Sequence, residues 1–477
     1  MARPIPPVPG AGRPGGRPGG ARRLPAAPPA RPRAGAGSSL ADRRVMTVIT
    51  VLLVSITVFQ RFGAPLGGVQ LSVSVLVAFA GLGYLMYHGD LVENGGATRV
   101  FVVAIALCFV TAALVLIRNG EGSVTSLLYL PIVWVVFCFR LHPARHHLYE
   151  RVLDRFEKVM VFFAVVGILQ TALQAARVWN YQDFILAFVP ESLLFTGYNT
   201  SYPIEYGNPI IKANGFVFLE PSVYGQFLAV ALLSALVRRA HWFRALLTGV
   251  ALVCTISGTG LLFVAFGIAV LAVRRGGRWT ARIAVAAVVG GAVALTTPFG
   301  AIIASRADET SQTNSSGSLR FVQPYQQILD SWGTDPLTIL LGRGAGYADA
   351  LAGQIFTATG LPINFSGFAK LLMEYGVIAT VLFSAFVALA VVRRAPAPTL
   401  ALSAVFANAI LTGALLQPQV LYLMVPLCSL FIGHRYEGDL DDLKRVQAGK
   451  PVRHRTDALA GVAVTVAPAD PNGRGGF

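Results

Sequence analysis

Charged residues are scarce in this chain: 13% of its 477 residues are Asp, Glu, Lys or Arg, whereas 54% are hydrophobic. Soluble globular domains average about 25% charged residues, so this composition excludes that class. The apolar residues form continuous runs near the roughly 20 residues that a helix needs to cross a bilayer, and they do not alternate as in a membrane β-barrel. We therefore predict an all-α polytopic membrane protein.

The chain also has little that would hold a metal or a nucleotide. Its four cysteines lie in apolar runs and form no Cys-x-x-Cys pair, which argues against disulfides and a zinc site. No Gly-x-x-x-x-Gly-Lys-Ser/Thr loop is present, which argues against an ATP-driven pump with its motor in this chain. Asp439 and Asp441 form an Asp-x-Asp pattern on a short polar tail, and a solvated acidic patch is the favoured interpretation. We expect neither a cofactor nor a metal.

The apolar runs predict about twelve transmembrane helices with boundaries uncertain by a few residues. The expected spans are Val45–Gln60, Leu71–His88, Val100–Ile117, Ser123–Phe139, Val159–Ala176, Ser222–Val237, Trp242–Ile256, Leu261–Val273, Ile283–Pro298, Gly367–Val392, Thr399–Leu416 and Val420–Gly433.

The basic residues fix an expected orientation, because Lys and Arg concentrate in short cytoplasmic loops. They cluster before the first span and after even-numbered spans, so both termini are expected in the cytoplasm. Residues 1–43 are rich in Pro, Gly, Ala and Arg, lack the apolar core of a signal peptide, and are expected to be a disordered tail, as is 434–477. Residues 44–433 would form the transmembrane catalytic domain. Much of the net charge of +16 falls in these tails and loops, so we expect membrane lipids rather than nucleic acid as a partner.

This topology leaves two long loops on the outer face, 177–221 and 299–366. Each contains an apolar stretch, Phe184–Val189 and Phe321–Ile328, which would lie on the membrane surface and form a lid over the bundle. The second loop carries Arg306, Arg320 and Arg343. Topology does not explain arginines on this side, so they indicate an anionic substrate.

Three ionisable residues stand at the outer ends of spans, where desolvation is costly unless they are paired or used. Glu220 precedes Pro221 and Ser222, so it is either a helix-start acid that complements the helix dipole or a functional carboxylate. Lys370 and Glu374 are four residues apart on one helical face. They form either an intrahelical ion pair or two groups facing the loop cavity.

The order of several short motifs resembles the bacterial O-antigen polymerase and ligase superfamily of glycan-assembly enzymes. These motifs are Phe-Leu-Glu-Pro-Ser at 218–222, Gly-Ser-Leu-Arg at 317–320, Leu-Leu-Gly-Arg-Gly-Ala-Gly at 340–346, and Glu-Tyr-Gly-Val-Ile at 374–378. Arg306 and Gly317 match the Arg-x10-Gly spacing of polymerases. Phe365 and Ser366 stand where the ligases carry His followed by Asn, Ser or Gln, so the polymerase branch is preferred.

The resemblance implies a polymerase that joins oligosaccharide repeat units carried on a polyprenyl pyrophosphate, at the outer face of the bacterial cytoplasmic membrane. Glu220 or Glu374 would be the general base, and Arg306, Arg320 and Arg343 would stabilise the departing pyrophosphate. Lys212, Lys370 and Tyr347 would add substrate contacts. A flippase and a chain-length regulator are the expected protein partners. Ligase-type transfer to another acceptor and a polysaccharide or lipid transporter stay open as alternatives.

Overall fold

The computed structural model describes residues 36–432 apart from 67–68, 121, 196, 205–206, 239–241 and 276–315. The expected span Ile283–Pro298, Arg306 and most of both expected tails lie outside the described residues. The first helix begins at Ala36, within the stretch expected to be a tail.

The described chain is built almost entirely of helices. The longer helices are α1 (Ala36–Val58), α2 (Val73–Tyr87), α3 (Gly95–Asn119), α4 (Val124–Trp134), α5 (Tyr149–Ala175), α7 (Pro221–Arg238), α8 (Trp242–Cys254), α9 (Gly258–Arg275), α13 (Gln323–Thr334), α15 (Tyr347–Thr359), α16 (Gly367–Val387) and α17 (Pro398–Phe406). The short helices are α6 (Phe184–Phe188), α12 (Ser316–Phe321), α14 (Thr338–Leu341) and α18 (Pro418–Leu421). Segments of 3-10 helix are η1 (Val135–Cys138), η2 (Pro143–Leu148), η3 (Glu191–Leu193) and η7 (Ala414–Leu416); segments of π-helix are η5 (Ala388–Val392), η6 (Ala407–Leu411) and η8 (Val425–Ser429).

Five helices in the described ranges are long and apolar enough to cross a membrane. They cover Gly95–Asn119, Pro143–Ala175, Pro221–Arg238, Gly258–Arg275 and Gly367–Val392, and five shorter apolar helices of 10–17 residues accompany them. This finding agrees with an all-α membrane protein. The expected number of about twelve spans stays a prediction.

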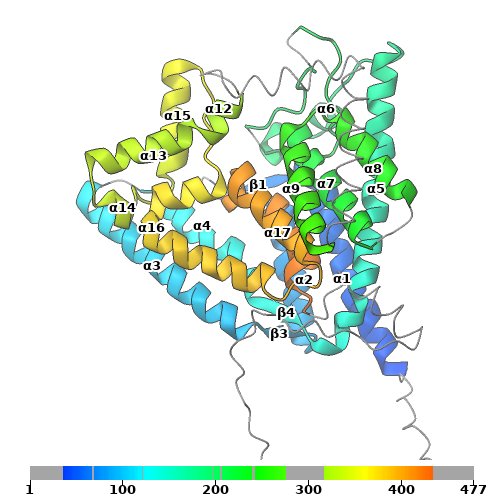
Figure 1. Cartoon of the computed structure of the whole chain (residues 1–477), viewed down its shortest axis with the longest axis horizontal. Helices are drawn as coiled ribbons and strands as arrows, with labels where there is room; N and C mark the ends of the chain where they lie inside the picture. The colour runs from blue at the N-terminus through cyan, green and yellow to red at the C-terminus, as the bar shows by residue number, and fades with distance from the viewer. Residues whose placement is uncertain are drawn as a thin grey trace, which may run out of the picture.

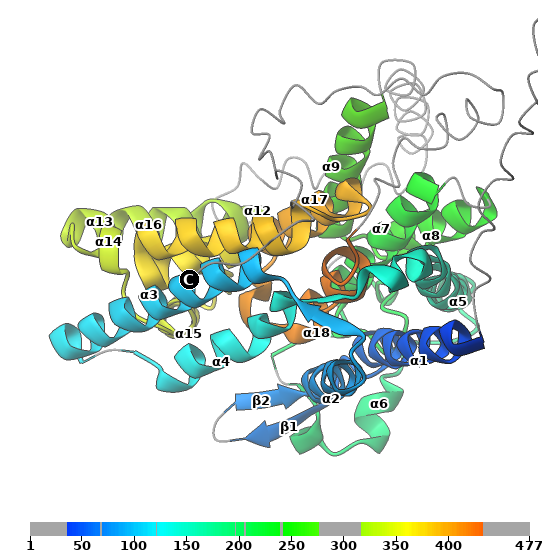
Figure 2. The same ribbon diagram turned by 90° about the horizontal axis from the view of Figure 1, so that it is seen from below.

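The helices form two groups joined by α17. In Figures 1 and 2, α3, α4 and α16 lie on one side, α5, α7, α8 and α9 lie on the other, and α17 runs between them. The closest pairings are α16 with α3 and α7 with α9, while α17 contacts both α7 and α9. Gly225 and Gly260 allow α7 and α9 to meet closely, because a Cβ on Gly260 would lie 3.0 Å from the Gly225 carbonyl carbon.

One end of the bundle, which we call the basic end, gathers ion pairs. Glu157 is 1% exposed and pairs with Arg238 at 2.9 Å and Arg244 at 3.0 Å. Asp90, which follows α2, accepts a hydrogen bond at 2.8 Å from the guanidinium of Arg44 in α1. In each pair the partner's opposite charge replaces the water that a buried charge would otherwise lose. The pairs therefore hold the helix ends together at this end of the bundle.

Two short antiparallel pairs of strands were not expected from the apolar runs. β1 (Gly63–Leu66) pairs with β2 (Val69–Ser72), and β3 (Leu91–Glu93) pairs with β4 (Phe139–Leu141). Each pair lies in connections between helices, and the pairing gives the backbone N–H and C=O groups of these connections hydrogen-bond partners.

The opposite end, the loop end, carries the long loops and a small hydrophobic core of its own. Leu319, Ile328, Ala348, Phe365 and Met373 are members of this cluster, which is separate from the main core of the bundle. It brings together α12, α13, α15 and the start of α16, and Figure 1 shows α12, α13 and α15 above α16. The described part of the second long loop, residues 316–366, thus packs as a cap on one group of helices.

Candidate active site

The segment that leads to Glu220 is neither helix nor strand, and buried amide side chains hold it. The Oε1 atom of Gln170 accepts from the backbone N–H groups of Asn214 at 3.2 Å and Gly215 at 3.3 Å. Gln60 Oε1 accepts from the N–H of Leu219 at 3.4 Å. Gln60, Gln170 and Asn214 are at most 1% exposed. These contacts replace the bonds that regular secondary structure would supply.

The backbone of this segment is also strained. Phe216 has a φ of 64°, a left-handed conformation that costs a side-chain-bearing residue roughly 1–3 kcal/mol. Asn214 stabilises it, because its Oδ1 accepts from the N–H of Phe216 at 3.0 Å while its Nδ2 donates to Tyr181 Oη at 2.7 Å. The hydrogen bonds that hold this strained backbone also position Glu220, the candidate catalytic acid four residues further along the chain.

Glu220 stands directly before the first residue of α7. Its carbonyl accepts from the N–H of Tyr224 at 3.1 Å, and its carboxylate accepts a hydrogen bond from the hydroxyl of Ser222. Glu220 is partly exposed, at the loop end. The helix-start role is therefore present in the structure, and it leaves part of the carboxylate accessible to a ligand.

A salt bridge anchors the first long loop beside this segment. Arg61 donates to both oxygens of Asp183, at 2.7 and 2.8 Å, and Asp183 also accepts from Thr200 at 2.7 Å. Burial alone would raise the pKa of Asp183, but the hydrogen bonds from Arg61, Thr200 and the Leu186 N–H outweigh it, so the pKa lies below its ordinary value.

Helix α16 is broken at the second candidate position. Gly376 has φ 74° and ψ −179°, which is not helical. The break frees the carbonyls of Met373 and Glu374, and these accept from the N–H groups of Arg343 at 2.8 Å and Gly344 at 2.9 Å. The motifs at 340–346 and 374–378 therefore form one structural unit in which a glycine-rich loop completes a broken helix.

Lys370 and Glu374 lie inside the protein at this break. The Lys370 Nζ is 3.9 Å from Glu374 Oε1, a weak intrahelical pair, and it donates a hydrogen bond to Asp349 of α15. The side chains of Lys370 and Glu374 are 6% and 0% exposed, whereas that of Asp349 is 67% exposed. The lysine therefore joins a buried carboxylate to one at the surface.

The Glu374 carboxylate has an unusual environment. Within the described ranges neither of its oxygens accepts a hydrogen bond of ordinary geometry. The backbone N–H groups of Gly346 and Ala348, at the start of α15, are directed toward it. A buried carboxylate without full hydrogen bonding is costly, which favours a functional role over packing.

A hydrogen bond and an electrostatic interaction link the two helix groups at the loop end. The guanidinium of Arg320, in α12, lies 3.5 Å from the hydroxyl of Thr259 at the start of α9. Tyr198, in the first long loop, is half-buried, and burial together with the carboxylates of Glu220 and Asp349 raises its pKa. Tyr198 therefore lies within the electrostatic reach of both acids.

The other expected site residues are placed differently. Arg343 turns away from the helix break, because its side chain donates to Ser331 Oγ at 2.7 Å and Thr334 Oγ1 at 3.2 Å, at the end of α13. Tyr347 packs against the small core of the loop end. The Lys212 ammonium lies 6.0 Å from the ring centre of Tyr202 in the first long loop. Their expected roles in substrate binding stay predictions, as does that of Arg306.

Sequence reasoning missed Asp349, Tyr198 and the amide residues that support Glu220. Gln170 gave a usable signal, since a polar residue within an apolar span is expected to have a specific partner. Asp349 gave none beyond its place in the first turn of a helix, because its partner Lys370 is 21 residues away.

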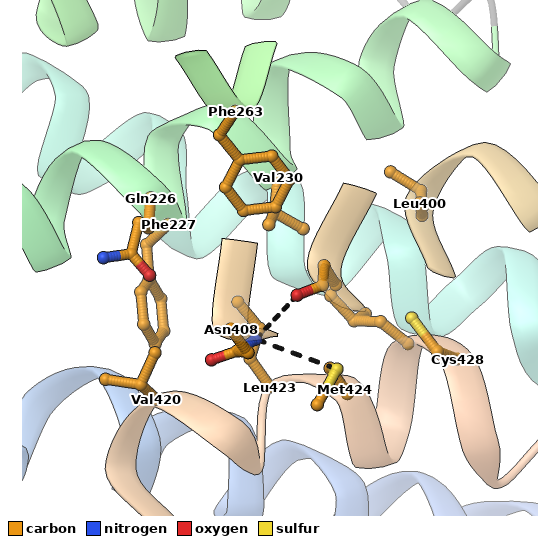
Figure 3. A pocket seen from close by; sticks show the side chains of 12 residues that line it. Gln226, Phe227, Val230, Phe263, Leu400, Asn408, Val420, Leu423, Met424 and Cys428 are labelled. Atoms are coloured by element: carbon orange, nitrogen blue, oxygen red, sulfur yellow. Dashed lines mark hydrogen bonds between the residues drawn. The ribbon is translucent and has the colours of Figure 1, made fainter. Parts of the chain in front are cut away.

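One cavity adjoins these charges, and another lies deeper among the helices of the bundle. A cavity of about 10 Å³, with room for about one water molecule, lies among Phe227, Phe263, Asn408 and Met424. The Asn408 amide donates to the Ala404 carbonyl at 2.8 Å and to the sulfur of Met424 at 3.8 Å. Figure 3 shows Asn408 and Met424 facing each other in this cavity. The second cavity, of about 230 Å³, is lined by Asp349 and Lys370 among others.

A family model matches residues 48–436, from the first helix to beyond the last described one, and its description is WcaD colanic acid polymerase. The chain belongs to this WcaD family. The match confirms the resemblance to the O-antigen and polysaccharide polymerases. No curated protein and no solved structure matches the chain.

Membership of the WcaD family supports a general role as a polysaccharide polymerase, a glycosyltransferase-like enzyme. Together with the apolar helices, it points to an enzyme that resides in a membrane and is consistent with action on lipid-linked glycans.

Proposed function

We propose that this WcaD-family chain joins oligosaccharide repeat units, each carried on a polyprenyl pyrophosphate, at the loop end of the bundle on the outer face of the bacterial cytoplasmic membrane. The observation that carries the proposal is the cluster of ionisable groups around the break in α16. Lys370 and Glu374 are buried in a membrane protein, and such groups are retained for function.

The reaction needs a base, an electrophilic sugar carbon and cations for the leaving group. A carboxylate, Glu220 or Glu374, takes the proton of the acceptor hydroxyl. The acceptor oxygen then bonds to the anomeric carbon of the donor while the bond from that carbon to the pyrophosphate oxygen breaks, and its electron pair leaves with the pyrophosphate. Arg320, with Arg306, stabilises the developing negative charge, so no metal is required.

The test is reconstitution of the purified protein in proteoliposomes with lipid-linked repeat units. We expect wild type to form a ladder of repeat multiples on lipid and to do so in the presence of a metal chelator. Arg320→Ala should lower the rate about 10²–10³-fold, as for the loss of one stabilising donor. Glu220→Gln and Glu374→Gln should separate the two candidates, because loss of the base costs about 10²–10⁴-fold.

Matched controls come from the same end of the molecule. Arg118 pairs with Asp335 at 3.0 Å with a 44% exposed side chain, and Glu191 is exposed in the first long loop. Arg118→Ala and Glu191→Gln should leave polymerisation unchanged. Transfer of glycan to a different acceptor would establish the ligase alternative, and transport without new glycosidic bonds would establish the transporter.

A further inference from the structure

The cavity beside Lys370 has the form of an open cleft. It is lined by Asp349, Asn364, Phe365, Lys370, Leu416 and Gln417, and Ala352, Ile363 and Gly413 complete the wall. Asp349 and Asn364 are exposed, whereas Lys370 and Phe365 are at most 5% exposed. The cleft thus opens at the loop end and reaches inward to the lysine.

Backbone contacts keep the walls of this cleft in place. The N–H of Gly367 donates to the carbonyl of Thr412 at 2.8 Å. A Cβ on Gly413 would lie 2.8 Å from Asn364 Oδ1, so the glycine lets this amide lie directly against the turn after η6. A preformed site of this kind loses little entropy when a ligand binds.

The size of the cleft limits its ligand. At about 230 Å³ it is smaller than the roughly 300–1,000 Å³ of pockets that enclose drug-sized ligands. It therefore suits a single sugar ring rather than a chain of sugars.

The charges around the cleft select the ligand further. Asp349 contributes −1 and Lys370 contributes +1, while Glu374, 3.9 Å from the Lys370 ammonium, contributes −1 or 0. The sum is −1 when Glu374 is ionised and 0 when it is protonated. In neither state does the cleft carry a net positive charge that would attract a pyrophosphate or a uronic acid. The amides of Asn364 and Gln417 each offer donors and acceptors for hydroxyl groups, and Phe365 offers an apolar surface for ring C–H groups.

We propose that this cleft binds the terminal sugar of the acceptor repeat unit, and that it selects a neutral pyranose over a uronic acid. The inference rests on the proposed polymerase function. It separates the acceptor subsite, at Asp349, Asn364, Lys370 and Gln417, from the pyrophosphate site at Arg320.

Sugar binding can be measured without turnover, by saturation-transfer NMR on the full-length protein in nanodiscs with neutral methyl pyranosides and methyl glucuronide as probes. We expect wild type to bind at least one neutral pyranoside about tenfold more tightly than the glucuronide. Asn364→Ala and Gln417→Ala should each weaken the pyranoside about tenfold, the equivalent of one hydrogen bond. Gln354→Ala, an exposed position on the same helix as Asp349, should change nothing.

A variant of Asp349 tests how the charge of the cleft selects its ligand. Asp349→Asn changes the sum of charges to 0 or +1, so it should tighten methyl glucuronide about tenfold while the melting temperature confirms a folded protein. Absence of pyranoside binding to wild type, or equal binding by wild type and both amide variants, would overturn the proposal.

Parallel polymerisation assays separate the two proposals. If polymer forms but Asn364→Ala and Gln417→Ala leave the KM for the acceptor unchanged, the cleft is not the acceptor subsite and the polymerase proposal stands. If pyranosides bind through the two amides but no polymer forms, the polymerase proposal fails and the cleft is a sugar site for another activity.

Discussion

At the scale of single residues, Gly376 is a position of the site at which little change can be tolerated. Its φ of 74° and ψ of −179° belong to a region that only glycine enters readily, and a Cβ would lie 2.3 Å from the carbonyl oxygen of Leu340. The same contact brings the glycine-rich loop onto the freed carbonyls of Met373 and Glu374. The geometry around Glu374 therefore depends on this one residue.

Gly376→Ala should both destabilise the protein and abolish polymerisation. The strained backbone costs roughly 1–3 kcal/mol, and the clash with Leu340 adds to it. We expect a lower melting temperature and loss of activity beyond what the stability change explains. Gly353→Ala is the control, because this helical glycine of α15 has nothing within 4 Å of a Cβ and should be neutral or slightly stabilising. Wild-type activity in Gly376→Ala would show that the break does not shape the site.

The candidate residues that the sequence predicts at the ends of spans share one property, because each stands out against an apolar background. Glu220, Lys370 and Glu374 were found in this way. Asp349 was not, because an acid at the start of a helix is common and its pairing with Lys370 exists only after the cap has folded onto α16. The direction of the Arg343 side chain likewise depends on the end of α13, which no local pattern reveals.

At the scale of elements, one ion pair joins α1 to the first long loop. Arg61 follows α1, and Asp183 precedes α6 and accepts from the N–H of Leu186 at 3.1 Å. Their side chains are 8% and 11% exposed, so water compensates little when one partner is removed. Asp183→Asn should leave the Arg61 charge buried, at a cost of about 3 kcal/mol.

The pH dependence of this pair follows from the lowered pKa of Asp183. Because the folded pKa lies below the ordinary value of 3.8, the pair stabilises the protein fully above that value and is lost as the pH falls through the folded pKa. Melting temperatures of wild type and Asp183→Asn should differ by several degrees at pH 7, and the difference should begin to shrink only as the pH falls below the ordinary value of 3.8. Asp335→Asn breaks the more exposed pair with Arg118 and should cost at most about 1 kcal/mol. An equal effect of both variants would mean that burial does not set the strength of the Arg61–Asp183 pair.

The helices themselves were largely predictable, because a span must be long and apolar whatever it packs against. Their ends were less so. Helix α5 begins at Tyr149, ten residues before the expected start of the span, since ion pairs from Asp154 and Glu157 to other helices satisfy its polar first turns. The expected surface segments Phe184–Val189 and Phe321–Ile328 overlap α6, α12 and α13. The β pairs had no counterpart in the apolar pattern because they depend on the contacts between loops.

At the scale of the whole molecule, charge divides the two ends. At the basic end, Arg145 pairs with both Asp42 and Asp90 at 3.2 and 3.1 Å, and further arginines pair with Glu157. The loop end carries the candidate site. Since basic residues concentrate on the cytoplasmic side, the loop end is expected outside, where a flipped lipid-linked glycan would be presented.

Cysteine labelling tests this orientation and, with it, the source of the substrate. Cys108, Cys138 and Cys428 are buried and Cys254 is half-buried, so a Cys254→Ala background should keep native labelling low. A cysteine replacing Gln354, exposed on α15, should react with a membrane-impermeant maleimide in intact cells. One replacing His147, whose side chain is 51% exposed at the basic end, should react only after permeabilisation. The reverse pattern would place Glu220, Lys370 and the sugar cleft in the cytoplasm, and a donor presented at the outer leaflet could then not reach them.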